Sequence, residues 1–307
     1  MTLSAPQRLT GKLTRLGDGM TIVRTLPSAR RRSIGAWCFL DHFGPVDVSG
    51  QDGLRVGPHP HIGLQTVTWL LDGEILHRDS LGSVQIIRPG QLNLMTSGCG
   101  ISHSEESPPG HPPGLHGAQL WIALPDAARF TEPTFAHHAE LPVFTHDGLR
   151  ISVLLGDVLG QVSPGKVFTP LMGAELFADA TTQATLPLRA DFEYGIQVLT
   201  GRLRVDDEVL EPGTLLYLEA GRAKLHLLAE AGHFLVGHGQ RRLGVTSRRA
   251  GPVPPVVSTR LQPASTSSIR VALMRSFSSG IRRGSKLMGL SRAPLSHACS
   301  AGKPLSS

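Results

Sequence analysis

Short runs of β-forming residues that alternate with glycine and proline turns dominate residues 57–124. The run TVTWLL (66–71) leads into Asp72-Gly73, a dipeptide that suits a tight hairpin because it tolerates positive φ, and EILHRD (74–79) follows. The later runs in this stretch are VQIIR (84–88), QLNLMT (91–96), ISHSE (101–105) and QLWIAL (119–124). Short strands at intervals of roughly ten residues predict an antiparallel sandwich or barrel.

A second series of the same kind occupies residues 150–238. Its runs are RISVLLG (150–156), EYGIQVLTG (193–201), RLRVDD (202–207), GTLLYLE (213–219), AKLHLLA (223–229) and HFLVGH (233–238). The segment IQVLTGRLRV…LEPGTLLYLEAG echoes VTWLLDGEILHRD…IRPGQLNLMTSG, which indicates an internal duplication. With 35 glycines, 23 prolines and only 18% charged residues in 307, the composition favours turns over helices. We therefore expect an all-β protein with two domains of similar plan.

The formal net charge of +6 combines two regions of opposite sign. Residues 240–307 hold twelve Lys and Arg and no Asp or Glu, which leaves 18 basic and 24 acidic side chains, a net charge of −6, in residues 1–239. The basic tail is rich in Ser, Arg, Pro and Gly, so we expect it to be disordered. Two alternatives stay open for it: short amphipathic helices at 269–277 and 281–290, and weak, salt-dependent contacts with nucleic acid.

The cellular location is predicted from what the sequence lacks. It shows no apolar run of the kind that forms a secretory signal or a membrane span, so we expect a cytoplasmic protein. Its three cysteines, Cys38, Cys99 and Cys299, are far apart and form no C-x-x-C pair, so we expect reduced thiols.

Two pairs of candidate metal ligands stand one residue apart within strand-like segments. His59 and His61 lie in GPHPHIGLQ (57–65), and His103 and Glu105 lie in GCGISHSEE (98–106). Residues at i and i+2 of a strand point to the same face, so each pair shares a face. If both faces line one barrel interior, three imidazoles and one carboxylate converge there.

The prolines around the first pair predict its place in the sheet. Pro58 and Pro60 cannot donate hydrogen bonds to a neighbouring strand, so this pair should lie at a strand start or on an edge strand.

Nitrogen and oxygen ligands without a thiolate suit a divalent first-row metal: iron, manganese, nickel, cobalt or zinc. Zinc would be satisfied tetrahedrally by the four ligands, whereas an octahedral ion would keep two positions open for a substrate oxygen and dioxygen. Burying these four groups without a metal would leave costly polar atoms unpaired.

Other polar residues are weaker candidates. His77 is predicted to lie either near the metal ligands or on an exposed hairpin, and Gln65 and His116 either line the pocket or merely pack. Cys99 is either a redox-sensitive thiol or a small residue in a turn. No G-x-S-x-G elbow, P-loop or G-x-G-x-x-G is present, which argues against serine hydrolase and nucleotide chemistry.

Four segments together resemble the pirins, a branch of the bicupin superfamily. They are AWCFLDHFGPV (36–46), VGPHPHIGLQTVTWLLDGEILHRDSLG (56–82), QLNLMTSGCGISHSEE (91–106) and LHGAQLWIALP (115–125). The resemblance covers about residues 10–238 and implies two stacked antiparallel β-barrels of cupin type. It implies a metal-binding barrel over residues 1–140 and a barrel without metal over 141–239. The basic tail, residues 240–307, follows them.

The resemblance also implies a metal site and an activity. By position, the ligands of the family fall on His59, His61, His103 and Glu105; the usual metal is iron, and several members resemble quercetin 2,3-dioxygenases. The sequence departs from the pattern at Gln65, where many cupins have glutamate, at Cys99, where pirins often have Arg or Ser, and after about Gly237, where the basic tail replaces the usual ending.

Two hypotheses for function follow. The first is an Fe(II)-dependent dioxygenase that cleaves quercetin or a related flavonol with dioxygen, in which Glu105 accepts the hydroxyl proton of the substrate. The alternative is a non-enzymatic, iron-binding regulatory protein that senses redox state and binds a protein partner. Both need the same ligands, and for both we expect a monomer.

Overall fold

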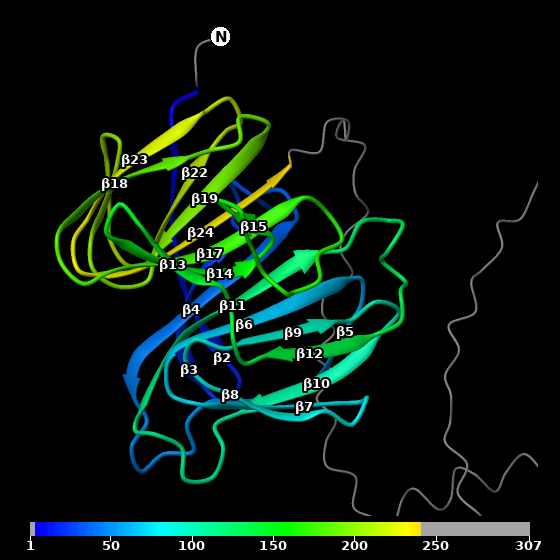
Figure 1. Ribbon diagram of the computed structural model, residues 1–307. Helices are drawn as coiled ribbons and strands as arrows, with labels where there is room; N and C mark the ends of the chain where they lie inside the picture. Colours follow the sequence, from blue (N-terminus) through cyan, green and yellow to red (C-terminus); the bar gives the residue numbers. More distant parts are fainter. Residues whose placement is uncertain (1–3, 241–307) are drawn as a thin grey trace, which may run out of the picture. The chain divides into compact units, whose positions relative to one another are not determined.

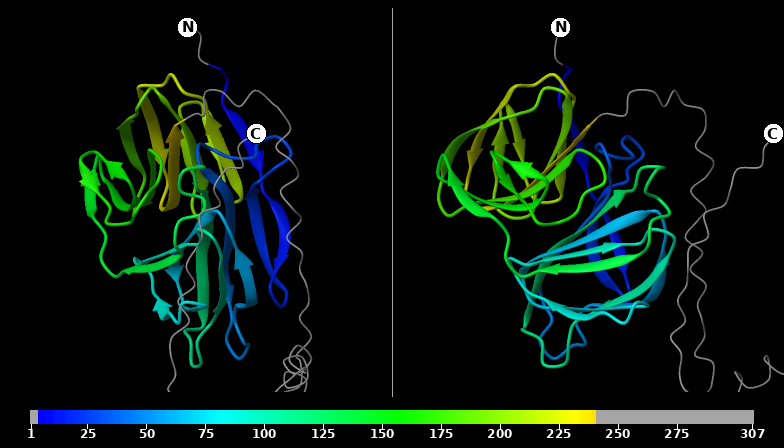
Figure 2. Two further views of the ribbon diagram at one scale, coloured as in Figure 1. Left: turned by 90° about the vertical axis from the view of Figure 1, so that its right-hand side faces the viewer. Right: turned by 45° about the vertical axis from the view of Figure 1, so that its right-hand side comes forward.

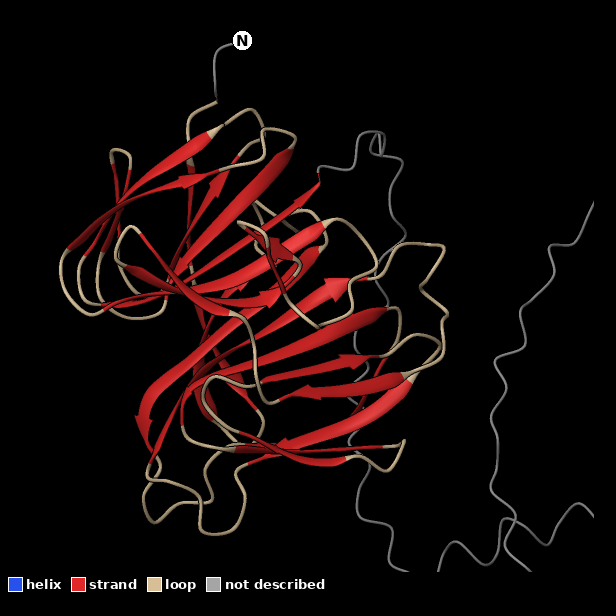
Figure 3. Cartoon of the chain, in the orientation of Figure 1, coloured by secondary structure: helices blue, strands red, loops and turns tan. Residues whose placement is uncertain are grey.

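The computed structural model describes residues 4–240, which form antiparallel strands, turns and loops without a helix (Figures 1 and 3). The all-β prediction is therefore confirmed for this part of the chain. The first half contains a large sheet, whose strands in spatial order are β12 (Thr134–His138), β9 (Leu92–Thr96), β6 (Leu64–Asp72), β11 (Gly114–Ala123), β4 (Trp37–Asp47), β3 (Met20–Leu26) and β2 (Lys12–Leu16). Its small sheet contains β5 (Arg55–His61), β10 (Ile101–Glu106), β7 (Ile75–Asp79) and β8 (Val84–Ile87).

The second half repeats this plan. Its large sheet contains β1 (Gln7–Thr10), β22 (Thr214–Leu218), β19 (Phe192–Val198), β24 (Gly232–Gln240), β17 (Leu171–Ala178), β14 (Leu149–Leu155) and β13 (Val143–His146). Its small sheet contains β18 (Thr182–Pro187), β23 (Lys224–Ala229), β20 (Leu203–Val205) and β21 (Glu208–Leu210), and a short hairpin adds β15 (Asp157–Val158) and β16 (Gln161–Val162).

The order of the strands agrees with an internal duplication. The run β9-β6-β11-β4-β3-β2 of the first large sheet corresponds, strand by strand, to β22-β19-β24-β17-β14-β13 of the second. The strands at one edge of the two large sheets come from different parts of the chain. In the first sheet, β12, which follows β11 in sequence, lies beside β9; in the second, β1 from the N-terminal region lies at the equivalent place beside β22. Figure 2 shows this N-terminal strand, in dark blue, running beside the second half.

Three apolar cores fill the space between and within the halves. One lies inside the second half and includes Ile151, Ile196 and Phe234. A second contains residues of both large sheets, among them Leu40, Leu120, Leu155 and Leu235, so the two large sheets pack face to face. The third lies inside the first half and has only eight buried residues, Ile22, Phe43, Val48, Leu54, Leu70, Ile75, Ile87 and Leu115. The first half therefore has interior space for polar side chains.

Trp37 of β4 ties the two large sheets together. Its indole N–H donates to the carbonyl oxygens of Met172 (3.2 Å) and His238 (3.3 Å) on the second sheet. A Cβ added at Gly173 would lie 2.9 Å from the Trp37 ring, and one added at Gly237 would lie 3.3 Å from it. These two glycines therefore make room for the indole.

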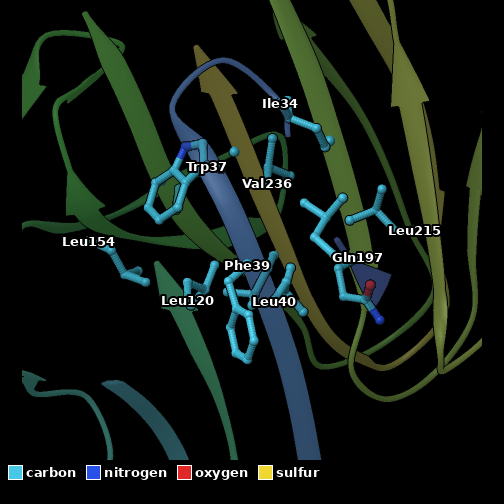
Figure 4. Close-up of a pocket in the computed structure, with 15 residues that line it drawn as sticks. Ile34, Trp37, Phe39, Leu40, Leu120, Leu154, Gln197, Leu215 and Val236 are labelled. Carbon is cyan, nitrogen blue, oxygen red and sulfur yellow. The ribbon is translucent and has the colours of Figure 1, made fainter. Parts of the chain in front are cut away.

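A small apolar cavity lies beside Trp37 between the halves (Figure 4), with Leu40, Leu154 and Val236 in its wall. Its volume is about 30 Å³. Sites for drug-sized molecules have volumes of roughly 300–1,000 Å³. This cavity is therefore too small to hold a molecule of that size.

Two buried histidines face each other across neighbouring strands of the first large sheet. Nε2 of His42 on β4 lies 2.9 Å from Nε2 of His116 on β11, and both side chains are buried. Burial, and then the neighbouring His116, lowers the pKa of His42 to about 4. Burial, and then His233, lowers the pKa of His116 to about 4, against the opposing charge of Asp72. Both imidazoles are therefore neutral at pH 7, and one donates a hydrogen bond to the other.

We expect the free energy of unfolding to decrease as the pH falls from 7 to 5, in part through His42. The unfolded chain binds a proton at His42 near pH 6.5, but the folded chain binds it only near pH 4. The contribution of His42 to stability is therefore fully present above pH 6.5 and is lost as the pH falls towards 4. One such group accounts for about 2 kcal/mol between pH 7 and pH 5. In urea denaturation, His42→Gln should lose about 2 kcal/mol less than the wild type over this interval. The control His226→Gln changes an exposed histidine, and equal pH slopes for all three proteins would contradict the prediction.

Candidate metal centre

Strands β5 and β10 of the small sheet carry the predicted ligands. β5 is an edge strand, which confirms the position predicted from its two prolines. β10 pairs with it so that His103 lies opposite His59 and Ile101 lies opposite His61. Along β10, Ile101, His103 and Glu105 are buried while the residues between them are more exposed, so the alternation of the strand directs these three inward.

The structure brings His59, His61 and His103 together. One nitrogen from each lies within 4.8 Å of the others, and Nε2 of His61 is 3.1 Å from Nε2 of His103. His59 is only partly buried, and its Nδ1–H donates to the carbonyl oxygen of Gly57 at 2.9 Å. This hydrogen bond leaves Nε2 of His59 with a lone pair available to a metal ion.

Glu105 belongs to a second group, which shares His103 with the first. One ligand atom each from His77, His103 and Glu105 also lie within 4.8 Å of one another. The Oγ1–H of Thr68, on the large sheet, donates to Oε1 of Glu105 at 2.9 Å. Glu105 is thus buried beside the three-histidine group, and Thr68 holds its Oε1. A carboxylate that accepts a hydrogen bond at one oxygen can still bind a metal ion through the other.

The electrostatics of the site suit a cation. Burial, and then the neighbouring imidazoles, lowers the pKa of His61 to about 3 and that of His103 to about 3. Both rings are therefore neutral at pH 7, and neutral imidazole is the form that binds metals. Three imidazole side chains with a carboxyl group beside them form a donor set that fits a divalent first-row metal.

His77 and Asp79 of β7 lie behind His103. Both are buried; Nε2 of His77 is 3.1 Å from Oδ2 of Asp79, and Nδ1 of His77 is 3.4 Å from Nδ1 of His103. Burial raises the pKa of Asp79, but hydrogen bonds from His77, Ser83 and Leu81 outweigh burial and leave it below the usual value. Of the two places predicted for His77, the structure shows the one near the ligands. Asp79 was missed, although its i, i+2 spacing from His77 repeats the spacing of the two ligand pairs.

Aromatic side chains form one wall of the site. Trp121 of β11 meets His61 edge to face, with ring centroids 4.9 Å apart, and stacks on Phe39 of β4 at 3.9 Å. Arg24 lies over Phe39 at 4.5 Å and forms two hydrogen bonds to the buried Asp41. Sequence reasoning missed these residues because only the pairing of β4 with β11 on one side and with β3 on the other brings them together.

The other candidates lie away from the metal ligands. The Gln65 amide donates to Thr96 and to the carbonyl oxygen of Lys166 in the second half, so it packs between the halves. His116 likewise packs against His42. Among the cysteines, Cys38 is a free thiol, whereas Cys99 is disulfide-bonded, so the expectation of reduced thiols is wrong at Cys99. The expectations for the tail and for Cys299 fall outside the described residues.

The second half has no equivalent donors at the matching place. The inward residues of β18 and β23 are Ala184, Leu186, Leu225 and Leu227, all members of its apolar core.

Among residues 4–240, no helix could cross a lipid bilayer.

Comparison with known proteins identifies relatives over most of the described chain. The family model described as Pirin matches residues 19–122. A Pseudomonas aeruginosa protein named "putative quercetin 2,3-dioxygenase" is 49% identical over 226 residues, which make up 74% of this chain and 71% of that protein. A "pirin-like protein" of Caulobacter vibrioides is 39% identical over 196 residues, 61% of this chain and 67% of its own. A crystal structure of quercetin 2,3-dioxygenase from Acinetobacter baumannii is 46% identical with a TM-score of 0.75, over 76% of this chain and 79% of that one.

Proposed function

The chain belongs to the pirin family, and from this premise we propose that it is a metal-dependent dioxygenase that cleaves quercetin or a related flavonol with dioxygen. The observation that carries the proposal is the group of three inward-facing histidines with Glu105 beside them. The relatives named as quercetin 2,3-dioxygenases, at 49% and 46% identity, support the substrate class.

We assign the metal to Nε2 of His59, to Nε2 of His61 and of His103, and to the carboxylate of Glu105. Ferrous iron is the proposed ion, and manganese, cobalt, nickel and zinc accept the same donors. When bound, such an ion acts as a Lewis acid and template that orients the flavonol oxygen towards dioxygen. The site is open at His59, which is partly exposed, and closed at His103, which is buried.

The residues around the metal position have separate tasks in this proposal. Glu105 accepts the 3-hydroxyl proton of the flavonol, because it is a buried carboxylate whose Oε1 is held in place by the hydroxyl of Thr68. Trp121 and Phe39 offer a flat apolar surface next to His61, which suits an aromatic substrate. His61 and His103 stay neutral and so compete with neither Glu105 nor the substrate for the proton.

Turnover of quercetin tests the proposal. Protein loaded anaerobically with ferrous iron should bind quercetin, and admitting air should remove the flavonol absorption band, consume oxygen and release carbon monoxide. Glu105→Gln should lower the turnover per bound metal ion by about 10²–10⁴, because the proton acceptor is lost.

Glu106→Gln is the matched control. Glu106 is the next residue on β10, is more exposed, and pairs with Arg78 at the surface, so its change should leave turnover near that of the wild type. Quercetin binding without oxygen uptake or carbon monoxide would overturn the enzymatic proposal and favour the non-enzymatic, redox-sensing alternative.

A further inference from the structure

We propose that Asp79 and His77 act as positioning residues that set the tautomer of His103, so that its Nε2 carries the lone pair offered to the metal. The inference rests on the proposed metal site but not on the proposed reaction. It concerns a buried chain of three side chains: the Asp79 carboxylate, the His77 ring and the His103 ring.

The chain begins at Asp79, whose carboxylate can only accept hydrogen bonds. Its Oδ1 accepts the backbone N–H groups of Leu81 at 2.9 Å and Ser83 at 3.0 Å. Its side chain is fully buried, and Oδ2 faces Nε2 of His77 at 3.1 Å. Because the partner of this oxygen has to be a donor, Nε2 of His77 carries the proton.

The next contact follows from the first. A neutral imidazole has one N–H and one lone pair, so a proton on Nε2 leaves Nδ1 of His77 as an acceptor. This nitrogen faces Nδ1 of His103 at 3.4 Å, so the proton of His103 sits on Nδ1. Nε2 of His103 is then the nitrogen with the lone pair, and it is also the one that lies 3.1 Å from Nε2 of His61.

The rigidity of this arrangement comes from packing. The ring of Phe135 on β12 stacks on the His77 ring, with centroids 4.3 Å apart and planes 11° from parallel. β7 pairs with β10 so that Asp79 lies opposite His103 and His77 lies opposite Glu105. Orienting partners of this kind fix the tautomer and the ring plane of histidine ligands.

The two candidate ion positions are distinguished by the same contacts. An ion held by His77, His103 and Glu105 has to use Nδ1 of His77, because Asp79 occupies Nε2. Such an ion would compete with the contact between His77 and His103, and it would leave His59 and His61 unused. The contacts therefore favour an ion among His59, His61 and His103, with His77 outside its ligand set.

Asp79→Asn tests the inference because it keeps the shape of the side chain and replaces one of its two acceptor oxygens with an NH₂ donor. The oxygen of the introduced amide can accept the two backbone N–H groups, and its NH₂ group then donates to Nε2 of His77. This reverses both tautomers and places a proton on Nε2 of His103. We expect cobalt(II) affinity, measured by competition with a chelator on the metal-free full-length chain, to fall by about 10–100-fold.

A second readout reports the tautomers directly. In ¹⁵N-histidine NMR spectra of the metal-free wild type, His103 should be protonated at Nδ1 and His77 at Nε2, and both should be reversed in Asp79→Asn. The control Asp47→Asn changes an exposed carboxylate that also accepts a backbone N–H, from Ser49, and should alter neither readout. A wild-type His103 protonated at Nε2, or unchanged cobalt affinity in Asp79→Asn, would overturn the inference.

Two variants at His77 keep the inference testable if Asp79→Asn does not fold. In His77→Asn, the shorter amide takes the place of Nδ1 and can still accept from His103. In His77→Gln, the longer amide reaches the place of Nε2 and keeps only the contact with Asp79. His77→Asn should therefore bind cobalt(II) more tightly than His77→Gln, and the reverse order would refute the assignment. None of these readouts needs turnover, so a protein that fails to cleave quercetin leaves this inference intact.

Discussion

Replacing His61 with alanine is expected to abolish metal binding. His61 is buried, and its Nε2 faces that of His103 at 3.1 Å, so the variant removes one of the nitrogens that would hold the ion. The loss of affinity should exceed the roughly 10–100-fold loss that follows when only a residue orienting a ligand is changed. Elemental analysis after loading with ferrous iron should show about one ion per wild-type chain and none in the variant.

The control for this experiment is His111→Ala. His111 belongs to the same half, but its ring contacts the carbonyl oxygens of Pro112 and Gln51 in a loop. It should keep its iron, and both variants should keep the strand signal in circular dichroism. Retention of iron by His61→Ala would disprove the assignment of the metal to this site, and with it the proposed dioxygenase and the redox-sensing alternative.

Replacing Trp37 with alanine is expected to cause a large loss of stability. The side chain is buried between the two large sheets, and truncating a buried tryptophan costs about 3–5 kcal/mol. The change also leaves the carbonyl oxygens of Met172 and His238 without the indole N–H. It enlarges a cavity that already exists beside the ring. The free energy of unfolding in urea measures the effect.

Trp37→Phe separates packing from hydrogen bonding. It keeps an aromatic ring between Gly173 and Gly237 but removes the N–H donor, so it should cost about 1–3 kcal/mol. A cost for Trp37→Ala below that of Trp37→Phe would show that the indole does not hold the sheets together. Because the metal ligands lie on the small sheet, iron content measured on folded Trp37→Phe should stay close to that of the wild type.

The regular part of the fold could be predicted from local sequence alone. The runs around Asp72-Gly73 form β6 and β7, and Gly73 has the positive φ of 85° that the turn requires. The strand β17, LMGAELFA, was missed because nearly all of its residues are buried, so no alternation of polar and apolar residues marks it. The place of β1 beside β22 was also missed, because a contact between strands at opposite ends of the described chain leaves no local pattern.

The sequence shows which residues of a strand share a face, but it does not show which of the two faces becomes the interior of the sheet. Gln65 and Thr68 lie on opposite faces of β6, since their positions differ by an odd number. Both are polar and both are buried, so the sequence could not show which one faces the metal site. The packing of the second half against the outer face decided this: Gln65 bonds to Lys166 there, and Thr68 reaches Glu105 inside.

The sequence by itself determined the strands of the two predicted series, the turns between them and the spacing of the ligands at i and i+2, because these depend on backbone geometry over a few residues. The tertiary structure alone decided that His59, His61 and His103 meet, that Thr68 holds Glu105, and that Asp79 contacts His77, which in turn contacts His103. These contacts depend on the register between strands far apart in the chain. The free energy that sets this register comes from burying whole sheet faces, and no short segment encodes it.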